Sequence, residues 1–308
     1  MKHFIDLSAV TSAEITELLH LAVKLKAEQK QNIPHHLLAG KTLGMIFAKS
    51  STRTRVSFEA GMYQLGGYPL ILSTNDIQLG RGETVYDTAK VLSRFIDAIM
   101  IRTFKQSDVE DLAKYGSIPV INALTDDTHP CQIMADLLTV QECKGKLEGL
   151  KLAYVGDGNN VANTLLQGCT KVGMHIAVAA PNGYGCPSRY VDEANENAKK
   201  TGSIVTITEN PVEAVKDADV LYTDTWVSMG QEAEKASRIE IFKDYQINSA
   251  LVAHAKPDAI FLHCLPAYRG LEVTEDIIDG PNSRVFDEAE NRLHVQKSIL
   301  VKLVSQQS

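Results

Sequence analysis

Residues 42–59 read TLGMIFAKSSTRTRVSFE, an apolar run followed by hydroxyls and arginines and then by the start of a helical pattern. A short, continuous apolar run is typical of a strand that is buried on both faces of a parallel sheet. Serine and threonine are favoured at helix N-caps, so residues 50–54 predict the turn into a helix. Together they predict a strand–loop–helix unit, from which doubly wound α/β folds are built.

The same alternation of strands and helices continues along the chain. In the first half we predict strands at 42–47, 69–73, 97–101 and 118–121, with helices near 54–66, 83–95, 107–115 and 131–143. In the second half we predict strands at 151–155, 175–180, 203–208, 219–223 and 259–263, with a shorter candidate at 284–286. Thr11 and Glu14 have the spacing of a capping box for an N-terminal helix, and a last helix is expected over about 288–304.

A charged, glycine-containing segment near residues 140–150 interrupts this pattern close to the middle of the 308-residue chain. A chain of this length suggests two domains. We therefore predict an α/β protein with two doubly wound parallel-sheet lobes, a first domain over 1–140 and a second over 150–287.

Composition excludes several classes of protein. Hydrophobic residues make up 44% and charged residues 22%, which is ordinary for globular proteins and unlike disordered chains. No apolar run reaches the roughly 18 residues of a membrane helix, and a net charge of −7 argues against a nucleic-acid partner. The five cysteines have neither zinc-site spacing nor an even number, so we expect no metal site, no disulfide framework and a reducing, cytoplasmic compartment.

Ligands of such sheets bind beyond the carboxyl ends of the strands, which selects the candidate residues. Residues 49–55 (KSSTRTR) follow the first strand and combine a helix start with arginines, a pattern that favours phosphate. Arg102 ends another strand and offers a further contact for an anion. His129 and Gln132 stand about one helical turn apart, and a histidine there can donate to a carbonyl oxygen that gains charge.

Three segments of the second half also follow strands. Residues 156–160 (GDGNN) begin like a dinucleotide-binding loop, but Val161 replaces the third glycine, which disfavours a nicotinamide cofactor. The amide side chains of this loop instead suit the polar groups of an amino acid. Residues 224–230 (DTWVSMG) and 263–266 (HCLP) complete the set, with Leu265-Pro266 a candidate cis bond. His263 and Cys264 should point to opposite faces, so no thiol-protease pair is expected.

Taken together, STRTR at 51–55, HPCQ at 129–132, DTWVSMG at 224–230 and HCLP at 263–266 resemble the ornithine carbamoyltransferases. Their order and spacing match over essentially the whole chain. The first two motifs resemble the wider carbamoyltransferase family, whereas the last two resemble its ornithine branch.

The resemblance implies a carbamoyl phosphate domain, an amino-acid domain and a C-terminal helix, about 288–308, that returns to the first lobe. It implies a homotrimer that needs no cofactor or metal. It assigns carbamoyl phosphate to Ser51, Thr52, Arg53, Thr54, Gln78, Arg102, His129, Gln132, Leu265 and Arg292. It assigns ornithine to Asn160, Asp224, Ser228 and Met229, and catalysis to Cys264 with Arg102, His129 and Thr54.

The implied reaction is carbamoyl transfer to the δ-amine of ornithine, which gives citrulline and phosphate through a tetrahedral intermediate. Asp224, Cys264 or the departing phosphate could take the amine proton, and the sequence leaves these bases open. Putrescine, which has no α-carboxylate, and N-acetylornithine, which has no α-amino charge, remain alternative acceptors. A non-catalytic binding homologue and a dinucleotide oxidoreductase are the alternatives from other classes.

Overall fold

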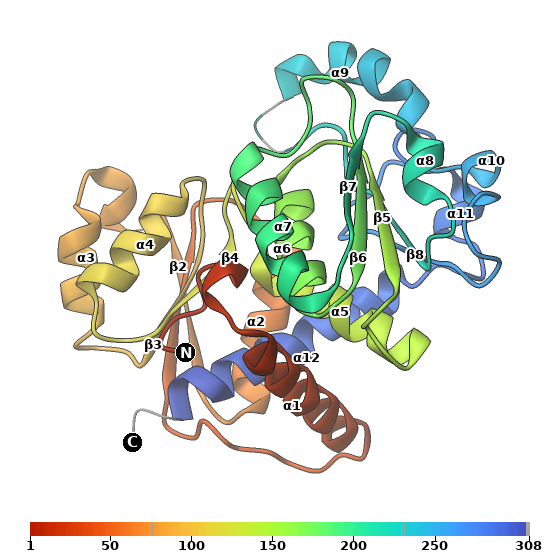
Figure 1. The fold of residues 1–308 in the computed structure, drawn as a ribbon. Coiled ribbons are helices and arrows are strands. Elements are labelled where there is room, and N and C mark those ends of the chain that lie inside the picture. The colour runs from red at the N-terminus through yellow and green to blue at the C-terminus, as the bar shows by residue number, and fades with distance from the viewer. Residues whose placement is uncertain (75–76, 229, 231, 306–308) are drawn as a thin grey trace. The chain divides into compact units, whose positions relative to one another are not determined.

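The computed structural model describes residues 1–74, 77–228, 230 and 232–305, and Figure 1 shows its elements in chain order. The chain divides into two compact units. Unit 1 comprises Met1–Leu138 with Glu290–Ser308, and unit 2 comprises Thr139–Ala289. The two boundaries fall within helices α5 (Pro130–Lys144) and α12 (Val285–Val304).

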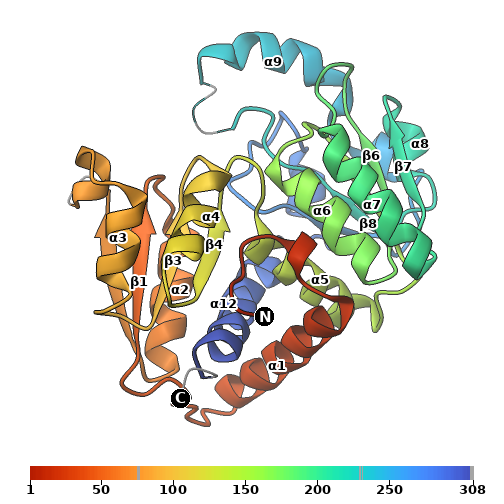
Figure 2. The same ribbon diagram turned by 60° about the vertical axis from the view of Figure 1, so that its left-hand side comes forward.

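Unit 1 is built on a parallel sheet of four strands in the order β2-β1-β3-β4. Its elements before α5 are η1 (Leu7–Ala9), α1 (Ser12–Lys30), β1 (Thr42–Phe47), α2 (Thr52–Gln64), β2 (Tyr68–Ser73), η2 (Gln78–Arg81), α3 (Val85–Leu92), β3 (Ala98–Arg102), α4 (Gln106–Tyr115) and β4 (Val120–Leu124). Figure 2 shows α3 and α4 in front of this sheet. Apolar side chains of β1, β3, α3 and α4, among them Ile46, Ile101 and Leu112, form a buried core in this unit.

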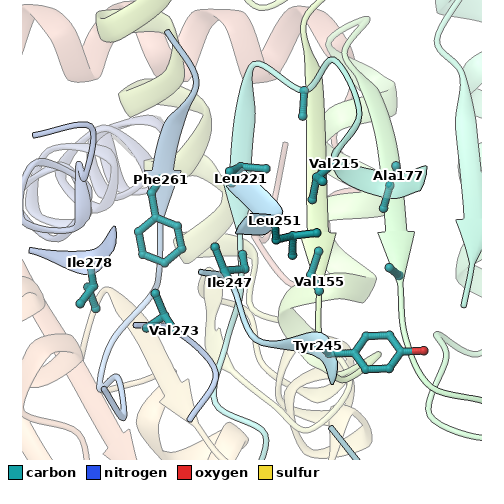
Figure 3. Close-up of a cluster of buried hydrophobic side chains, with 14 of the residues drawn as sticks. Val155, Ala177, Val215, Leu221, Tyr245, Ile247, Leu251, Phe261, Val273 and Ile278 are labelled. Carbon is teal, nitrogen blue, oxygen red and sulfur yellow. The ribbon is translucent and has the colours of Figure 1, made fainter. Parts of the chain in front are cut away.

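Unit 2 is built on a parallel sheet of five strands in the order β7-β6-β5-β8-β9. Its elements are β5 (Lys151–Val155), α6 (Asn160–Lys171), β6 (His175–Ala179), α7 (Ser188–Thr201), β7 (Val205–Thr208), α8 (Pro211–Val215), β8 (Val220–Tyr222), η3 (Glu232–Glu234), α9 (Lys235–Phe242), η4 (Lys243–Tyr245), α10 (Ser249–Val252), β9 (Ile260–Leu262) and α11 (Glu275–Ile278). Figure 3 shows a core of this unit, in which Val155, Leu221 and Phe261 come from three neighbouring strands.

Each sheet has a point at which the direction of winding reverses. In unit 1 the order places this point between β1 and β3, and in unit 2 between β5 and β8. Ligands of doubly wound sheets bind at the carboxyl ends of the strands beside such a point. Topology alone therefore selects residues 48–51 and 102–103 in unit 1, and residues 156–159 and 223–228 in unit 2.

The predicted fold class is confirmed, including the return of the last helix to the first lobe. In unit 1, Lys26 of α1 donates to Asn291 of α12 at 2.7 Å, and Lys297 of α12 donates to Gln64 of α2 at 3.0 Å. The capping box is also present, since Thr11 accepts from the Glu14 amide and the Glu14 carboxylate accepts from the Thr11 amide. No helix among the described residues is both long and apolar enough to span a bilayer.

The short strand predicted at 284–286 is wrong. Ser283 makes only an isolated bridge to Phe261, and α12 already begins at Val285. Asp287 and Glu288 lie in the first turn of α12, where negative charge is favoured by the helix dipole. The acidic residues that follow the apolar pair therefore favour a helix start over a strand.

Candidate active site

The first polar cluster lies in unit 1, at the start of α2. Ser51 is the N-cap of this helix, and its Oγ accepts a hydrogen bond from the Thr54 amide at 3.2 Å. Thr52 is the exposed first residue of the helix, whereas Thr54 is buried. The N–H groups of a first helical turn and the helix dipole both favour an anion. The predicted phosphate loop thus forms a helix start at the carboxyl end of β1.

A buried histidine and three arginines complete the electrostatics of this cluster. His129 immediately precedes α5 and is 4% exposed. Burial first, and then the charges of Arg292, Arg102 and Arg53, hold its pKa well below the usual 6.5. The imidazole is therefore neutral near pH 7 and can donate a hydrogen bond to an oxygen that gains negative charge.

Arg292 of α12 connects the helix start to α5. Its Nη2 donates to Thr54 Oγ1 at 3.1 Å, and its Nη1 donates to Gln132 Oε1 at 2.6 Å. Seven predicted residues are thereby joined by capping, hydrogen bonds or mutual electrostatics: Ser51, Arg53, Thr54, Arg102, His129, Gln132 and Arg292. Gln78 instead has an exposed side chain on η2, after the edge strand β2. Among the described residues, no hydrogen bond or ion pair joins the Gln78 side chain to this cluster.

Lys49 is a further cation of this loop and the first residue of the predicted segment 49–55. Its side chain is 5% exposed and forms an ion pair with Asp126. Its ammonium also lies 4.4 Å from the centre of the Phe104 ring. Lys49 therefore ties the loop after β1 to the loop after β4, which leads to His129.

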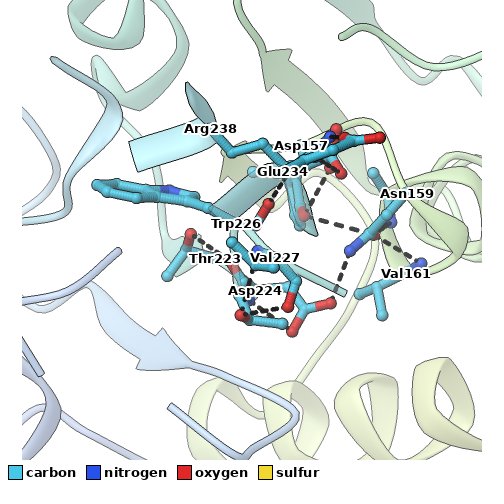
Figure 4. Close-up of polar contacts among 12 residues, drawn as sticks. Asp157, Asn159, Val161, Thr223, Asp224, Trp226, Val227, Glu234 and Arg238 are labelled. Carbon is cyan, nitrogen blue, oxygen red and sulfur yellow. Dashed lines mark hydrogen bonds and ion pairs between the residues drawn. The ribbon is translucent and has the colours of Figure 1, made fainter. Parts of the chain in front are cut away.

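The second polar cluster lies in unit 2 and centres on Asp224, after β8 (Figure 4). Its Oδ2 accepts from Asn159 Nδ2 at 2.7 Å, and its Oδ1 accepts from the Cys264 thiol at 3.1 Å and from the Thr225 amide at 2.8 Å. Asn159 is also the N-cap of α6. The predicted pair of Asp224 and Cys264 is thus in direct contact, and the amide that contacts Asp224 belongs to Asn159.

The other predicted residues of this unit lie close in the sequence to these contacts. Asn160 begins α6 next to Asn159, and Ser228 follows Val227 in the loop after β8; both are partly buried. Met229 lies outside the described residues.

Arg238 of α9 anchors the loop that carries Ser228. Figure 4 shows its guanidinium between Asp157 and the backbone of Trp226. It forms an ion pair with Asp157, donates to the Trp226 carbonyl oxygen, and lies 5.2 Å from the Phe242 ring centre. Burial outweighs this cation and raises the pKa of Asp157 to about 6. Arg238 therefore connects α9 to Trp226 in the loop after β8 and to Asp157 in the loop after β5.

Gly158, in the loop after β5, serves close backbone packing. A Cβ on Gly158 would lie 2.3 Å from the carbonyl carbon of Gly185 and 2.4 Å from the Cys186 nitrogen. The close approach of this backbone therefore requires a glycine at position 158, independently of any dinucleotide-binding pattern.

His263 is buried and supports the segment after β9. Its Nδ1 accepts from the Leu265 amide at 2.9 Å, and its Nε2 lies 3.2 Å from Glu272 Oε1. Leu265 has a positive φ of 57° and precedes a cis peptide bond to Pro266. Asp224, His263 and Cys264 offer ligand atoms within 4.8 Å of one another. Both nitrogens of His263 are already engaged, however, so this arrangement disfavours metal binding.

Comparisons with known proteins agree with these two clusters. Residues 2–142 match the carbamoyl-P binding domain of the aspartate/ornithine carbamoyltransferases, and residues 148–303 match their Asp/Orn binding domain. The chain is 62% identical over 301 residues to an ornithine carbamoyltransferase of Caldicellulosiruptor saccharolyticus, covering 98% of both chains. It is 60% identical to that of Bacillus subtilis, covering 97% of this chain and 92% of the relative. The solved ornithine carbamoyltransferase of Pyrococcus furiosus is similar with a TM-score of 0.96 at 54% identity, covering 100% of this chain and 98% of that one.

Proposed function

The chain belongs to the aspartate/ornithine carbamoyltransferase family, and we propose that it transfers the carbamoyl group of carbamoyl phosphate to the δ-amine of L-ornithine. The products are L-citrulline and phosphate. The observation that carries this function is 62% identity to an ornithine carbamoyltransferase over 98% of both chains. The contact of Asp224 with Cys264 supports the ornithine branch, because both belong to the motifs that resemble it.

The domain over 1–140, with the C-terminal helix about 288–308, is the proposed carbamoyl phosphate domain. The start of α2, with Ser51, Thr52, Arg53 and Thr54, takes the phosphate. Arg102 and His129 polarise the carbonyl and stabilise the tetrahedral oxyanion, with Thr54 as an additional donor. Gln132, Arg292, the backbone of Leu265 and Gln78 are the remaining proposed contacts, with Gln78 supplied to a neighbouring subunit. The support is the buried cationic surroundings of His129.

The domain over 150–287 is the proposed ornithine domain. Asp224 is suited to the α-ammonium group, because three hydrogen bonds hold its negatively charged carboxylate in a fixed orientation. The residue is 7% exposed, so water screens this charge little. Asn160, Ser228 and Met229 are the other proposed ornithine contacts. A free alkylamine has a pKa of about 10.4, so the δ-amine must lose a proton before it attacks. The thiol of Cys264, which donates to Asp224, is the proposed catalytic group of this domain.

A homotrimer in the cytoplasm is the proposed state. Large apolar side chains of unit 1 stay exposed in a single chain, including Tyr63 at 77%, Phe95 at 75% and Val56 at 57%. Exposed apolar groups of this size are typical of surfaces covered by a partner. All five cysteines are free, in keeping with a reducing compartment. Sedimentation equilibrium should give three times the mass of one chain, and a monomer would refute the trimer.

The deciding experiment measures citrulline formation from carbamoyl phosphate and ornithine, beside putrescine, N-acetylornithine and aspartate as acceptors. We expect turnover with ornithine alone. Turnover with putrescine or N-acetylornithine would identify another acceptor, and folded protein that binds carbamoyl phosphate without any turnover would indicate a binding homologue. Cys264→Ala should lower the rate or the affinity for ornithine, with Cys143→Ala, an exposed cysteine of the same unit, as the matched control.

A further inference from the structure

The side chain of Asn159 has two sets of partners in unit 2 (Figure 4). As the N-cap of α6, its Oδ1 accepts hydrogen bonds from the amides of Val161 at 3.0 Å and Ala162 at 3.2 Å. Its Nδ2 donates to Asp224 Oδ2 at 2.7 Å. The resemblance assigns ornithine to the neighbouring Asn160 and gives Asn159 no role.

Donor and acceptor chemistry fixes the orientation of the Asn159 amide. The backbone N–H groups of Val161 and Ala162 can only donate, so the atom that faces them must be the oxygen. A carboxylate can only accept, so the atom that faces Asp224 must be the nitrogen. Reversing the amide would break all three hydrogen bonds. Asn159 is therefore a rigid donor, held by the first turn of α6 and directed at Asp224.

The two oxygens of Asp224 depend on different donors. Oδ1 accepts from the Thr225 amide at 2.8 Å and from the Cys264 thiol, a weak donor, at 3.1 Å. Within the described part of the chain, the one donor to Oδ2 is Asn159. The χ2 torsion of aspartate is broad, so contacts to a single oxygen leave the plane of the carboxylate free to turn. The second contact point, at Asn159, fixes this plane.

We propose that Asn159 is a positioning residue that holds the Asp224 carboxylate in the orientation that binds an α-ammonium group, so that unit 2 selects α-amino acids over amines without that group. This inference rests on the proposed function. An ionised carboxylate has about four acceptor sites, and three are occupied, which leaves roughly one for the substrate. An amide suits this role because it donates without neutralising the carboxylate, whereas a lysine or arginine would compete with the α-ammonium group.

The test separates the donor of Asn159 from its capping role. Asn159→Ser keeps a favoured N-cap residue but has no group that reaches Asp224, and Asn159→Ala removes both the cap and the donor. Citrulline formation by the full-length protein gives KM for ornithine. Inhibition of this reaction gives Ki for δ-aminovalerate, which keeps the δ-amine and the carboxylate but has no α-amino group.

We expect the affinity for ornithine to follow the donor and the stability to follow the cap. Both variants should raise KM for ornithine roughly tenfold, with a much smaller change in kcat, because a hydrogen bond to a charged group is lost. Neither should change Ki for δ-aminovalerate or KM for carbamoyl phosphate by more than about twofold. Only Asn159→Ala should lower Tm by a few degrees.

Asn210 supplies the matched control, because it caps α8 in the same unit and accepts from the amides of Val212 and Glu213. Asn210→Ala should lower Tm to a similar extent and leave KM for ornithine unchanged. A wild-type KM in Asn159→Ser would refute the positioning role, and so would an equal weakening of ornithine and δ-aminovalerate; both leave the proposed function intact. If the wild type forms no citrulline, the proposed function fails and this inference fails with it. Should Asn159→Ala not fold, Asn159→Gly takes its place, since glycine is tolerated at an N-cap.

Discussion

Replacing Arg238 with methionine tests the central anchor of unit 2. Arg238 is 4% exposed, and its ion-pair partner Asp157 is 8% exposed. The substitution removes the hydrogen bonds to Asp157 and to the Trp226 carbonyl oxygen, and with them the guanidinium that lies over the rings of Tyr184 and Phe242. It therefore leaves a buried carboxylate and a buried carbonyl without their cation.

The magnitude follows from burial and from the titration of Asp157. Removing one partner of a buried ion pair costs about 3–5 kcal/mol. Because the pKa of Asp157 is raised from 3.8 to about 6, its contribution to stability is present below pH 3.8 and is lost as the pH rises through 6. Removing the Arg238 charge raises this pKa further. The loss of stability in Arg238→Met should therefore be largest near pH 8 and smaller near pH 5, where Asp157 is mostly protonated.

Fluorescence of Trp226 provides the assay. It is the only tryptophan of the chain, is 3% exposed, and stacks on Phe242 with ring centres 6.0 Å apart. For a unit of this size, 1 kcal/mol corresponds to about 2–4 °C in Tm, so the loss of about 3–5 kcal/mol in Arg238→Met should lower Tm by roughly 6–20 °C at pH 8. The expected decrease at pH 5 is about half as large.

A surface ion pair supplies the matched control. Arg269 pairs with Asp279 at 2.6 Å in the same unit, but the two side chains are 43% and 40% exposed. Exposed ion pairs contribute little to stability, so the Tm of Arg269→Met should lie close to that of the wild type at both pH values. If Arg238→Met and Arg269→Met have the same Tm at pH 8, the reasoning from burial is wrong. If the Tm of Arg238→Met falls as much at pH 5 as at pH 8, the reasoning from the titration of Asp157 is wrong.

Three further predictions concern the loop after β5, the first helix and His129. Gly158→Ala would bring a Cβ within 2.3 Å of the Gly185 backbone and should raise KM for ornithine severalfold; an unchanged KM would contradict the close-packing role. Thr11→Ala removes the N-cap of α1 and should cost about 1 kcal/mol in thermal unfolding followed by circular dichroism, whereas Thr11→Ser should cost much less. His129 should stay neutral between pH 8 and 6, and because its pKa is lowered it should destabilise the fold as the pH falls below 6.5; an NMR titration with a midpoint near 6.5 would rule this out.

Local patterns predicted most of the elements, because each depends on neighbours in the sequence. The apolar run at 42–47 corresponds to β1 (Thr42–Phe47), and the capping-box spacing of Thr11 and Glu14 corresponds to the start of α1. The strand prediction at 284–286 was wrong because it rested on two adjacent apolar residues, at 285 and 286. Adjacent apolar residues occur both in strands and in the first turn of a buried helix.

Side-chain contacts between distant segments were beyond reach of these patterns. Asp157 and Arg238 are 81 residues apart, and Gln132 and Arg292 are 160 residues apart. Arg238 lies on a short helix with two other charged residues, Lys235 and Glu240, so nothing in its neighbourhood marks it as buried. Asn159 and Asn160 are adjacent amides, and only the capping of α6 turns Asn159 toward Asp224.

The amino-acid sequence was sufficient for the alternation of strands and helices and for the polar residues that follow each strand, because period, capping and motif spacing are local properties. It was also sufficient for the family, since the motifs occur in order along the whole chain. Strand order, which sets the two points of reversed winding, depends on which strands pair across long stretches of chain. Contacts between segments far apart in the sequence likewise decide which side chain holds another in place, as Arg292 holds Gln132 and Arg238 holds Asp157. Burial gives these contacts their energy, and burial is a property of the folded chain alone.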